Sequence, residues 1–236
     1  MSQLALPLSL RDGGVFESFW SAGNEPLVAF LKSLADDGTS GAANEAGCWL
    51  WGGPATGKTH LLHAVCERLA DDAVFLPLEQ FAHADPGILD GLASRRCVCL
   101  DNVDSVAGDE GFELALFALL NELADREGLL VASAKAAPRD SGFTLADLHS
   151  RLSRLPVFHV EPLDETARVQ ALKLRARHRG LELPDDTARF LLARSRRDMT
   201  SLYRLLDKLD AEALVAQRRL TIPFVRDVLA SVPGRK

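Results

Sequence analysis

The stretch that most constrains the fold is a glycine-rich loop between an apolar run and a helical pattern. The pattern Gly-x-x-x-x-Gly-Lys-Thr spans residues 52–59 and matches a phosphate-binding loop in full. The loop follows the apolar run Cys48–Trp51 and opens the helical pattern Lys58–Leu69. This order of strand, loop and helix is the context that the motif requires, and it is typical of an α/β domain.

Each residue type in this loop suits an anionic ligand. Glycines let backbone N–H groups turn inward around phosphate oxygens, and the start of the following helix adds positive potential. Lys58 is placed to reach the outer phosphates, and Thr59 offers a hydroxyl to Mg²⁺. We therefore predict a nucleotide site made by Gly52, Gly53, Pro54, Ala55, Thr56, Gly57, Lys58, Thr59 and His60.

A second apolar run, Cys97–Leu100, ends in an acidic residue. We predict that Asp101 holds Mg²⁺ together with Thr59. Many ATPases of this architecture have a second carboxylate at the next position, where this chain has Asn102. An amide can position a water molecule but cannot accept its proton, so we expect weak or absent hydrolysis by this chain alone. Asp104, two residues further on, is a candidate to take the place of the missing base.

Short apolar runs alternate with helical patterns as far as about residue 160. The predicted strands are Cys48–Trp51, Ala73–Pro77, Cys97–Leu100, Leu129–Ser133 and Val157–Val160. The helical patterns between them are Lys58–Leu69, Pro86–Leu92, Glu110–Arg126 and Leu145–Leu155. This alternation predicts an α/β fold with a five-stranded parallel sheet covered on both faces by helices.

The strand signal stops after Pro162. Four amphipathic helix patterns follow: Asp164–Arg179, Pro184–Arg194, Met199–Ala216 and Pro223–Leu229. The net charge changes at the same place, from −11 over residues 1–160 to +5 over residues 161–236. We predict an N-terminal segment over residues 1–12, an α/β nucleotide-binding domain over 13–160 and a small four-helix lid over 161–236.

The composition excludes several classes of protein. No apolar run approaches the roughly 18 residues of a membrane span, and Pro7 interrupts the only apolar stretch near the N-terminus, so we expect neither membrane association nor a signal peptide. The cysteines are Cys48, Cys66, Cys97 and Cys99, and none forms a Cys-x-x-Cys pair. We expect reduced thiols, with Cys97 and Cys99 on one face of a strand, and a cytoplasmic location.

Arginines occur at two places where they can meet a nucleotide. Arg151 and Arg154 are three residues apart, and such a spacing puts both on one face of a helix. An arginine at a subunit edge can stabilise the charge that develops on a neighbour's γ-phosphate. Arg196 and Arg197 precede the third lid helix, where an arginine can fold back onto the nucleotide. From spacing alone, ordinary surface charge is the favoured interpretation of both pairs.

Taken together, the loop, the Asp-Asn strand end, the arginine before the fifth strand and the four-helix piece resemble an AAA+ module. The stretches GDEGFELALFALLNEL, LRARHRGLELPDDTARFLLAR and AQRRLTIPFVRDVL are similar to the Hda family of DnaA-related AAA+ proteins, regulatory inactivators of the replication initiator DnaA. Phe16–Leu31 resembles the segment beside the adenine in DnaA-like proteins. The resemblance runs from about Gln3 to Leu229.

The resemblance gives a role to the N-terminal hexapeptide QLALPL. In the family, Gln-Leu-x-Leu-Pro-Leu is the ligand for the bacterial polymerase sliding clamp, which implies clamp binding by Gln3, Leu4, Ala5, Leu6, Pro7 and Leu8. Pro7 excludes a helix and biases Leu6 toward an extended backbone, so that alternate leucines can enter an apolar pocket. A strand packed on the domain's own body is the alternative.

Other roles follow from the resemblance position by position. Arg151 matches the family's arginine finger, which acts on ATP bound to DnaA, and Arg197 matches the lid arginine that senses nucleotide. The match implies bound ADP or ATP with Mg²⁺. Ala134 departs from the pattern, because a polar sensor residue is usual there and Ser133 is the nearest hydroxyl. This departure agrees with a protein that holds ADP rather than turning over ATP.

The resemblance implies a negative regulator of DNA replication initiation that is not an enzyme by itself. Such an ADP-bound adaptor joins the sliding clamp to DnaA and stimulates hydrolysis of DnaA-bound ATP in trans, which prevents re-initiation. The alternatives are a self-sufficient AAA+ ATPase, acting as clamp-loader subunit or helicase loader, and a nucleotide-dependent scaffold. We expect no sequence-specific DNA binding, and a homodimer is among the oligomeric states that the sequence leaves open.

Overall fold

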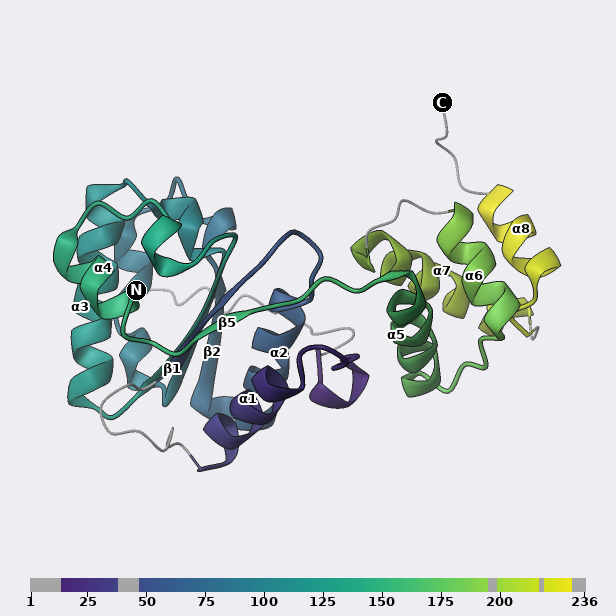
Figure 1. Ribbon diagram of the computed structural model, residues 1–236, viewed down its shortest axis with the longest axis horizontal. Helices are drawn as coiled ribbons and strands as arrows, with labels where there is room; N and C mark the ends of the chain where they lie inside the picture. The colour runs from purple at the N-terminus through teal and green to yellow at the C-terminus, as the bar shows by residue number, and fades with distance from the viewer. Residues whose placement is uncertain (1–13, 38–46, 195–198, 217–218, 231–236) are drawn as a thin grey trace.

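The computed structural model describes residues 14–37, 47–194, 199–216 and 219–230 (Figure 1). Gln3–Leu8 and Arg197 fall outside these ranges, so the predictions made for them lie outside the described residues.

The centre of the molecule is a parallel sheet with the strand order β2-β3-β4-β1-β5. Its strands are β1 (Gly47–Trp51), β2 (Ala73–Pro77), β3 (Cys97–Asp101), β4 (Leu129–Ala134) and β5 (Val157–His159). The predicted five-stranded parallel sheet is therefore confirmed, with strand ends shifted by at most one residue. The carboxyl ends of β1 and β3 face the same edge of the sheet, where ligands of such sheets bind.

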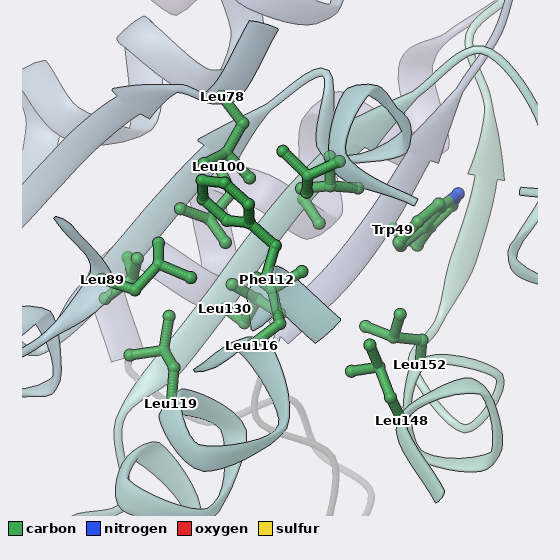
Figure 2. Packing of buried hydrophobic residues seen from close by; sticks show 14 of the residues in the cluster. Trp49, Leu78, Leu89, Leu100, Phe112, Leu116, Leu119, Leu130, Leu148 and Leu152 are labelled. Atoms are coloured by element: carbon green, nitrogen blue, oxygen red, sulfur yellow. The ribbon is translucent and has the colours of Figure 1, made fainter. Parts of the chain in front are cut away.

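Helices cover both faces of the sheet, and alternate strand residues enter two separate cores. The helices are α1 (Glu25–Asp37), α2 (Lys58–Leu69), α3 (Glu110–Asp125) and α4 (Ala146–Leu152). Cys48 and Leu50 pack with α1 and α2, whereas Trp49 points to the face covered by α3 and α4. Figure 2 shows the second core, where Phe112 and Leu116 of α3 pack against Leu100 and Leu130.

Short 3₁₀ helices connect several of these elements. They span Phe16–Ser18, Ala70–Asp72, Leu78–Gln80, Pro86–Leu89, Leu92–Ser94, Val103–Val106 and Pro138–Asp140. The helix predicted over Pro86–Leu92 is wrong, because two 3₁₀ turns replace it. Gly91 lies between them with φ 74°, a left-handed conformation that a right-handed helix cannot contain.

The helix that contains Arg151 is also shorter than predicted. The pattern predicts a helix over Leu145–Leu155, but α4 spans Ala146–Leu152. Pro156 disfavours helical geometry at the residue before it, and the chain then enters β5. Arg154 lies beyond the helix end, so the prediction that Arg151 and Arg154 share a helical face is wrong.

The four predicted lid helices are confirmed as α5 (Glu165–His178), α6 (Asp185–Arg194), α7 (Met199–Ala216) and α8 (Ile222–Ala230). They pack around their own apolar core, which includes Leu172, Leu206 and Val225. Asp164 caps α5 by accepting a hydrogen bond from the N–H of Ala167 at 2.7 Å. Figure 1 shows the lid at one end of the molecule, beyond β5 and away from α3 and α4.

The cysteines are free thiols within the core between α2 and the sheet. The sulfur atoms of Cys97 and Cys99 lie 3.9 Å apart, which confirms that both side chains point to one face of β3. Burial raises the pKa of Cys48, so this thiol is unreactive. Within the described part of the chain, no helix combines the length and the apolar character that crossing a membrane requires.

Candidate nucleotide site

The glycine-rich loop folds tightly around its own lysine. Lys58 Nζ donates hydrogen bonds to the carbonyl oxygens of Gly52 at 2.7 Å and Gly53 at 2.8 Å. Gly57 precedes α2 with φ 102°, and a Cβ atom there would lie 2.7 Å from the ring of Phe19. Only glycine fits this position, and its lack of a side chain leaves the first turn of α2 without a side-chain cap. Uncapped amides at a helix N-terminus fit a phosphate group.

The lysine is a buried cation at the floor of the site. Only 7% of Lys58 is exposed, and burial lowers the pKa of its ammonium group. The nearby carboxylates of Asp101 and Asp104 act in the opposite direction and raise this pKa. A desolvated cation interacts more strongly with phosphate than a solvated one, which suits Lys58 to its predicted role.

Two hydroxyl groups hold the carboxylate of Asp101. Thr59 Oγ1 donates to Asp101 Oδ2 at 2.7 Å, and Ser133 Oγ donates to Oδ1. Asp101 is 3% exposed and Ser133 is fully buried, so neither group has much freedom to turn. The structure thus brings together Thr59 and Asp101, and a hydroxyl beside a carboxylate fits Mg²⁺. Ser133 is a direct partner of Asp101, whereas the sequence marked it only as a neighbouring hydroxyl.

A carboxylate from the turn after a neighbouring strand lies beside Asn102. The Nδ2 atom of Asn102 donates to Glu79 Oε2 at 3.1 Å, and Glu79 comes from the 3₁₀ turn that follows β2. Asn102 has φ 55°, a left-handed conformation that asparagine tolerates. Its backbone is fixed by a bond from its N–H to Ser133 Oγ at 3.0 Å. The site therefore contains a carboxylate next to Asn102, the position at which many ATPases of this architecture have a second acidic residue.

A cleft of about 750 Å³ lies between the loop, the N-terminal part of the described chain and the lid. Its lining residues are Gly14, Ser18, Phe19, Trp20, Pro54, Ala55, Thr56, Gly57, Lys58, Thr59, His60, His63, Glu79, Asn102, Lys135, Leu163, Arg175, Met199, Tyr203, Arg204 and Asp207. Ala134 is fully buried and contributes no polar group, while the next residue, Lys135, lines the cleft. The cleft is large enough for a small-molecule ligand such as a nucleotide.

The lid wall of the cleft contains cations that the sequence did not single out. The guanidinium of Arg175, on α5, lies 4.2 Å from the ring centroid of Tyr203 on α7. Burial raises the pKa of Tyr203 to about 12, so its phenol is neutral at physiological pH. Arg179 forms an ion pair with Asp207 at 2.5 Å. No sequence motif marks Arg175, because only the packing of α5 against α7 turns it toward the cleft.

Residues 14–24, which we call the N-terminal bridge, join the loop helix to the lid hinge. His60 Nε2 lies 2.9 Å from the carbonyl oxygen of Val15 and 3.4 Å from Ser18 Oγ. Burial lowers the pKa of His60 to about 4, so this ring is neutral at pH 7 and supplies no charge to a phosphate.

The N-terminal bridge also contacts the lid. Trp20 packs against the lid core. At the hinge, Asn24 and Glu161 exchange two hydrogen bonds.

Arg151 lies away from this cleft. It is exposed on α4 and is not among the residues that line the cleft, and its guanidinium lies 5.3 Å from the ring centroid of Phe117. Figure 1 shows α4 beside α3, on the side of the sheet that is remote from the lid.

Asp104, the candidate base, also lies outside the residues that line the cleft. Its buried Oδ1 atom has no hydrogen-bond partner among the described residues.

Comparison with known proteins shows which lid and which fold this chain resembles. Residues 164–229 match the family model described as "Hda, lid domain". Domain III of the replication initiation protein DnaA from Thermotoga maritima superposes with a TM-score of 0.74 and 20% identity over 93% of this chain and 96% of that chain. The lid is therefore similar to that of Hda, and the chain shares the fold of DnaA domain III.

Other solved structures show how general the fold is. AMPPCP-bound DnaA from Aquifex aeolicus matches this chain with a TM-score of 0.67 and 20% identity, over 86% of this chain and 66% of that one. The RuvB Holliday junction branch migration motor from T. maritima matches with a TM-score of 0.63 and 16% identity, over 89% of this chain and 68% of that chain. At these identities the likeness shows the fold and leaves the activity to be argued from the site.

Proposed function

We propose that this AAA+ chain is a negative regulator of DNA replication initiation. It acts as an ADP-bound adaptor that joins the polymerase sliding clamp to DnaA and stimulates hydrolysis of the ATP bound to DnaA. ATP-bound DnaA is thereby converted to ADP-bound DnaA, and replication origins do not fire again. In this account the chain is not an enzyme by itself, because the reacting nucleotide is held by its partner.

The placement of Arg151 is the observation that supports this proposal most strongly. The side chain is exposed, and the cleft of its own chain is lined by other residues. An arginine presented in this way can stabilise a transition state only in the site of a second molecule, where such a group is worth about 10³–10⁵ in rate. The match of the lid to the Hda family points to DnaA as that molecule.

The cleft supports the proposal that this chain holds a nucleotide of its own. Lys58 and the amides at the start of α2 would bind phosphate oxygens, and Thr59 and Asp101 would hold Mg²⁺. Bound Mg²⁺ would neutralise phosphate charge. The residue after Asp101 is an amide, which supports a nucleotide that is retained as ADP rather than turned over. A nucleotide between loop and lid would fix the relative placement of the two.

Gln3–Leu8 would tether the chain to the clamp, and the N-terminal bridge begins six residues after this peptide. Tethering raises the concentration of Arg151 near DnaA on the same DNA without any new contact between the two proteins. We infer a cytoplasmic protein whose partners are the clamp and DnaA, with no sequence-specific contact to DNA. Arg197 would sense the nucleotide from the lid.

The experiment that tests the adaptor role measures hydrolysis of DnaA-bound ATP with clamp loaded on DNA. The proteins compared are the wild type and the double variant Gln3→Ala/Leu4→Ala. We expect strong stimulation by the wild type and none by the variant, because the variant is not recruited to the clamp. Equal stimulation by both proteins would contradict the tether. A complex that forms normally without any change in hydrolysis would point to a scaffold instead.

One observation favours a second candidate, a self-sufficient ATPase acting as a clamp-loader subunit or helicase loader. Glu79 lies in the cleft beside Asn102, so a carboxylate is present near the position of the missing acid. The test is ATP turnover by the isolated chain and by Glu79→Gln. Turnover near about 1 per second that Glu79→Gln abolishes would select the ATPase, and undetectable turnover would support the adaptor.

A further inference from the structure

A buried acidic residue of α3 holds the chain at the start of the helix that contains Arg151. Glu113 is only 1% exposed. Its Oε2 atom accepts hydrogen bonds from the N–H of Leu145 at 2.6 Å, and from both the N–H and the hydroxyl of Thr144 at 3.0 Å. Its Oε1 atom accepts from the N–H of Gly108 at 2.7 Å and again from that of Thr144 at 3.0 Å. The carboxylate thus joins two separate segments of the backbone, one at Gly108 and one at Thr144 and Leu145.

These bonds hold the chain at the N-cap of α4, where the local side chain makes no such bond. Leu145 is the N-cap residue of α4, and its apolar side chain makes no capping hydrogen bond. A helix N-terminus has unpaired N–H groups and favours a negative charge, and Glu113 provides the charge from a neighbouring helix. Because α4 has only seven residues, its own hydrogen bonds cannot keep it folded in water. Its place must therefore be set by contacts with the rest of the domain.

The ionisation of Glu113 agrees with this role. Burial alone would raise its pKa, but the hydrogen bonds from Thr144, Gly108 and Leu145 outweigh burial, and its pKa lies below the ordinary value. The group is therefore a carboxylate at neutral pH, able to accept from every donor that faces it.

One turn along the same helix, α3 also supports the far end of α4. Phe117 follows Glu113 by four residues, so both lie on the same face of α3. The Phe117 ring faces the guanidinium of Arg151 at 5.3 Å, while Leu148 and Leu152 enter the core beneath α4. Figure 2 shows Leu148 and Leu152 pointing into this core. The two leucines anchor α4 in the core, and Glu113 fixes where α4 starts.

We propose that Glu113 is the positioning residue for Arg151, acting through the start of α4. The inference rests on the proposed function of Arg151 as a group that acts on a neighbouring molecule. A helix held at one end by a buried carboxylate places an exposed arginine within a narrow range, and a misplacement of about 1 Å can cost as much as 10²-fold in rate. Glu113 itself touches neither the nucleotide of this chain nor that of its partner.

The test uses Glu113→Gln, which is nearly isosteric. One carboxylate oxygen becomes an NH₂ donor, and in either orientation this donor faces N–H groups. They are those of Thr144 and Leu145 at one position and those of Gly108 and Thr144 at the other, so hydrogen bonds of the cluster are lost in both cases. The matched control is Glu110→Gln, the same change at an exposed position one turn earlier in α3. Phe117→Leu is a third variant that keeps apolar packing on α3 but removes the ring beneath Arg151.

The first readout is amide hydrogen exchange of the full chain, which does not depend on DnaA. In Glu113→Gln we expect exchange in Ala146–Leu152 to accelerate at least about tenfold, with exchange in β4 unchanged. Exchange in Glu110→Gln should match the wild type. Unchanged exchange of α4 in Glu113→Gln would overturn the proposal, and acceleration throughout the α/β domain would show a general loss of stability and overturn it as well.

The second readout is stimulation of DnaA-bound ATP hydrolysis as a function of the concentration of this chain. We expect Glu113→Gln and Phe117→Leu to lower the maximal stimulation about tenfold and to change the half-saturating concentration less than about twofold. If Arg151→Ala abolishes stimulation while Glu113→Gln keeps it in full, this inference fails and the proposed function stands. If Arg151→Ala stimulates in full, the proposed function fails and the inference falls with it.

Discussion

Asn24 and Glu161 hold each other through a reciprocal pair of hydrogen bonds across 137 residues of sequence. Asn24 Nδ2 donates to the carbonyl oxygen of Glu161 at 3.3 Å, and the N–H of Glu161 donates to Asn24 Oδ1 at 2.9 Å. Glu161 lies at the hinge between β5 and the lid, and Asn24 is buried at the end of the N-terminal bridge. A single side chain therefore connects the start of the described chain to the base of the lid.

We predict that Asn24→Ala loosens the lid hinge. The variant removes both hydrogen bonds to the backbone of Glu161. The expected cost of about 1–3 kcal/mol corresponds to a loss of about 5- to 150-fold in affinity for a nucleotide bound under the lid. The measurement is ADP affinity by calorimetry. The control is Glu161→Ala, which keeps both backbone bonds and removes only the exposed ion pair with His159. Equal losses in the two variants would contradict the role of Asn24.

We predict that Ser133→Ala weakens nucleotide binding only when Mg²⁺ is present. The variant removes the hydroxyl that holds Asp101 Oδ1 and pairs with the N–H of Asn102. Asp101 is then free to turn from the position that suits a cation, and affinity for ADP with Mg²⁺ should fall about tenfold. Affinity measured with a chelator present should change little. Ser105→Ala, which removes a hydroxyl that bonds only to the carbonyl of Asn102, is the comparison.

We predict that the fold loses stability as the pH falls below neutrality, in part through His60. Its pKa is lowered to about 4 in the folded chain from the ordinary 6.5, so the unfolded chain binds more protons between these values. The contribution of His60 is present in full above pH 6.5 and is lost as the pH falls toward 4, by up to about 3 kcal/mol. Urea unfolding of wild type and His60→Asn at pH 7 and pH 5 checks this, and the variant should show the smaller pH dependence.

We predict that Asn102→Asp alone gives this chain less ATP hydrolysis than Glu79→Gln/Asn102→Asp. The single variant places a second carboxylate within hydrogen-bond distance of Glu79, and two such charges repel, so one of them takes up a proton and is lost as a base. The double variant exchanges the amide and the acid and keeps their hydrogen bond. Single-turnover hydrolysis by the purified chain distinguishes the two, and a higher rate for the single variant would contradict the argument.

Much of the α/β fold could be predicted because its strands are short apolar runs ended by turn residues. The loop motif also placed the start of α2 at Lys58, since the motif contains the helix N-terminus. Thr59 and Asp101 could be predicted as a pair because Asp101 ends a buried strand, and Thr59 lies in the first turn of the helix that the loop motif defines. The failures have local causes, since Gly91 interrupts one expected helix and Pro156 shortens another.

The remaining site residues depend on which elements pack side by side, and composition or spacing does not encode this. Glu79 meets Asn102 only because β2 lies next to β3 in the sheet. Arg175 faces the cleft only because α5 packs against α7. Glu113 reads in the sequence as an ordinary helical acid, and it acts on α4 because residues 144 and 145 return to its side of α3.

The central claim is tested most directly by hydrolysis of DnaA-bound ATP, with clamp loaded on DNA, in the presence of Arg151→Ala or Arg154→Ala. Arg154 is also exposed but lies beyond the end of α4, so its loss controls for a change of surface charge. We predict that the Arg151→Ala variant loses stimulation of DnaA-bound ATP hydrolysis but still binds ADP and the clamp as the wild type does. The Arg154→Ala variant should stimulate hydrolysis in full. Full stimulation by Arg151→Ala would contradict the account.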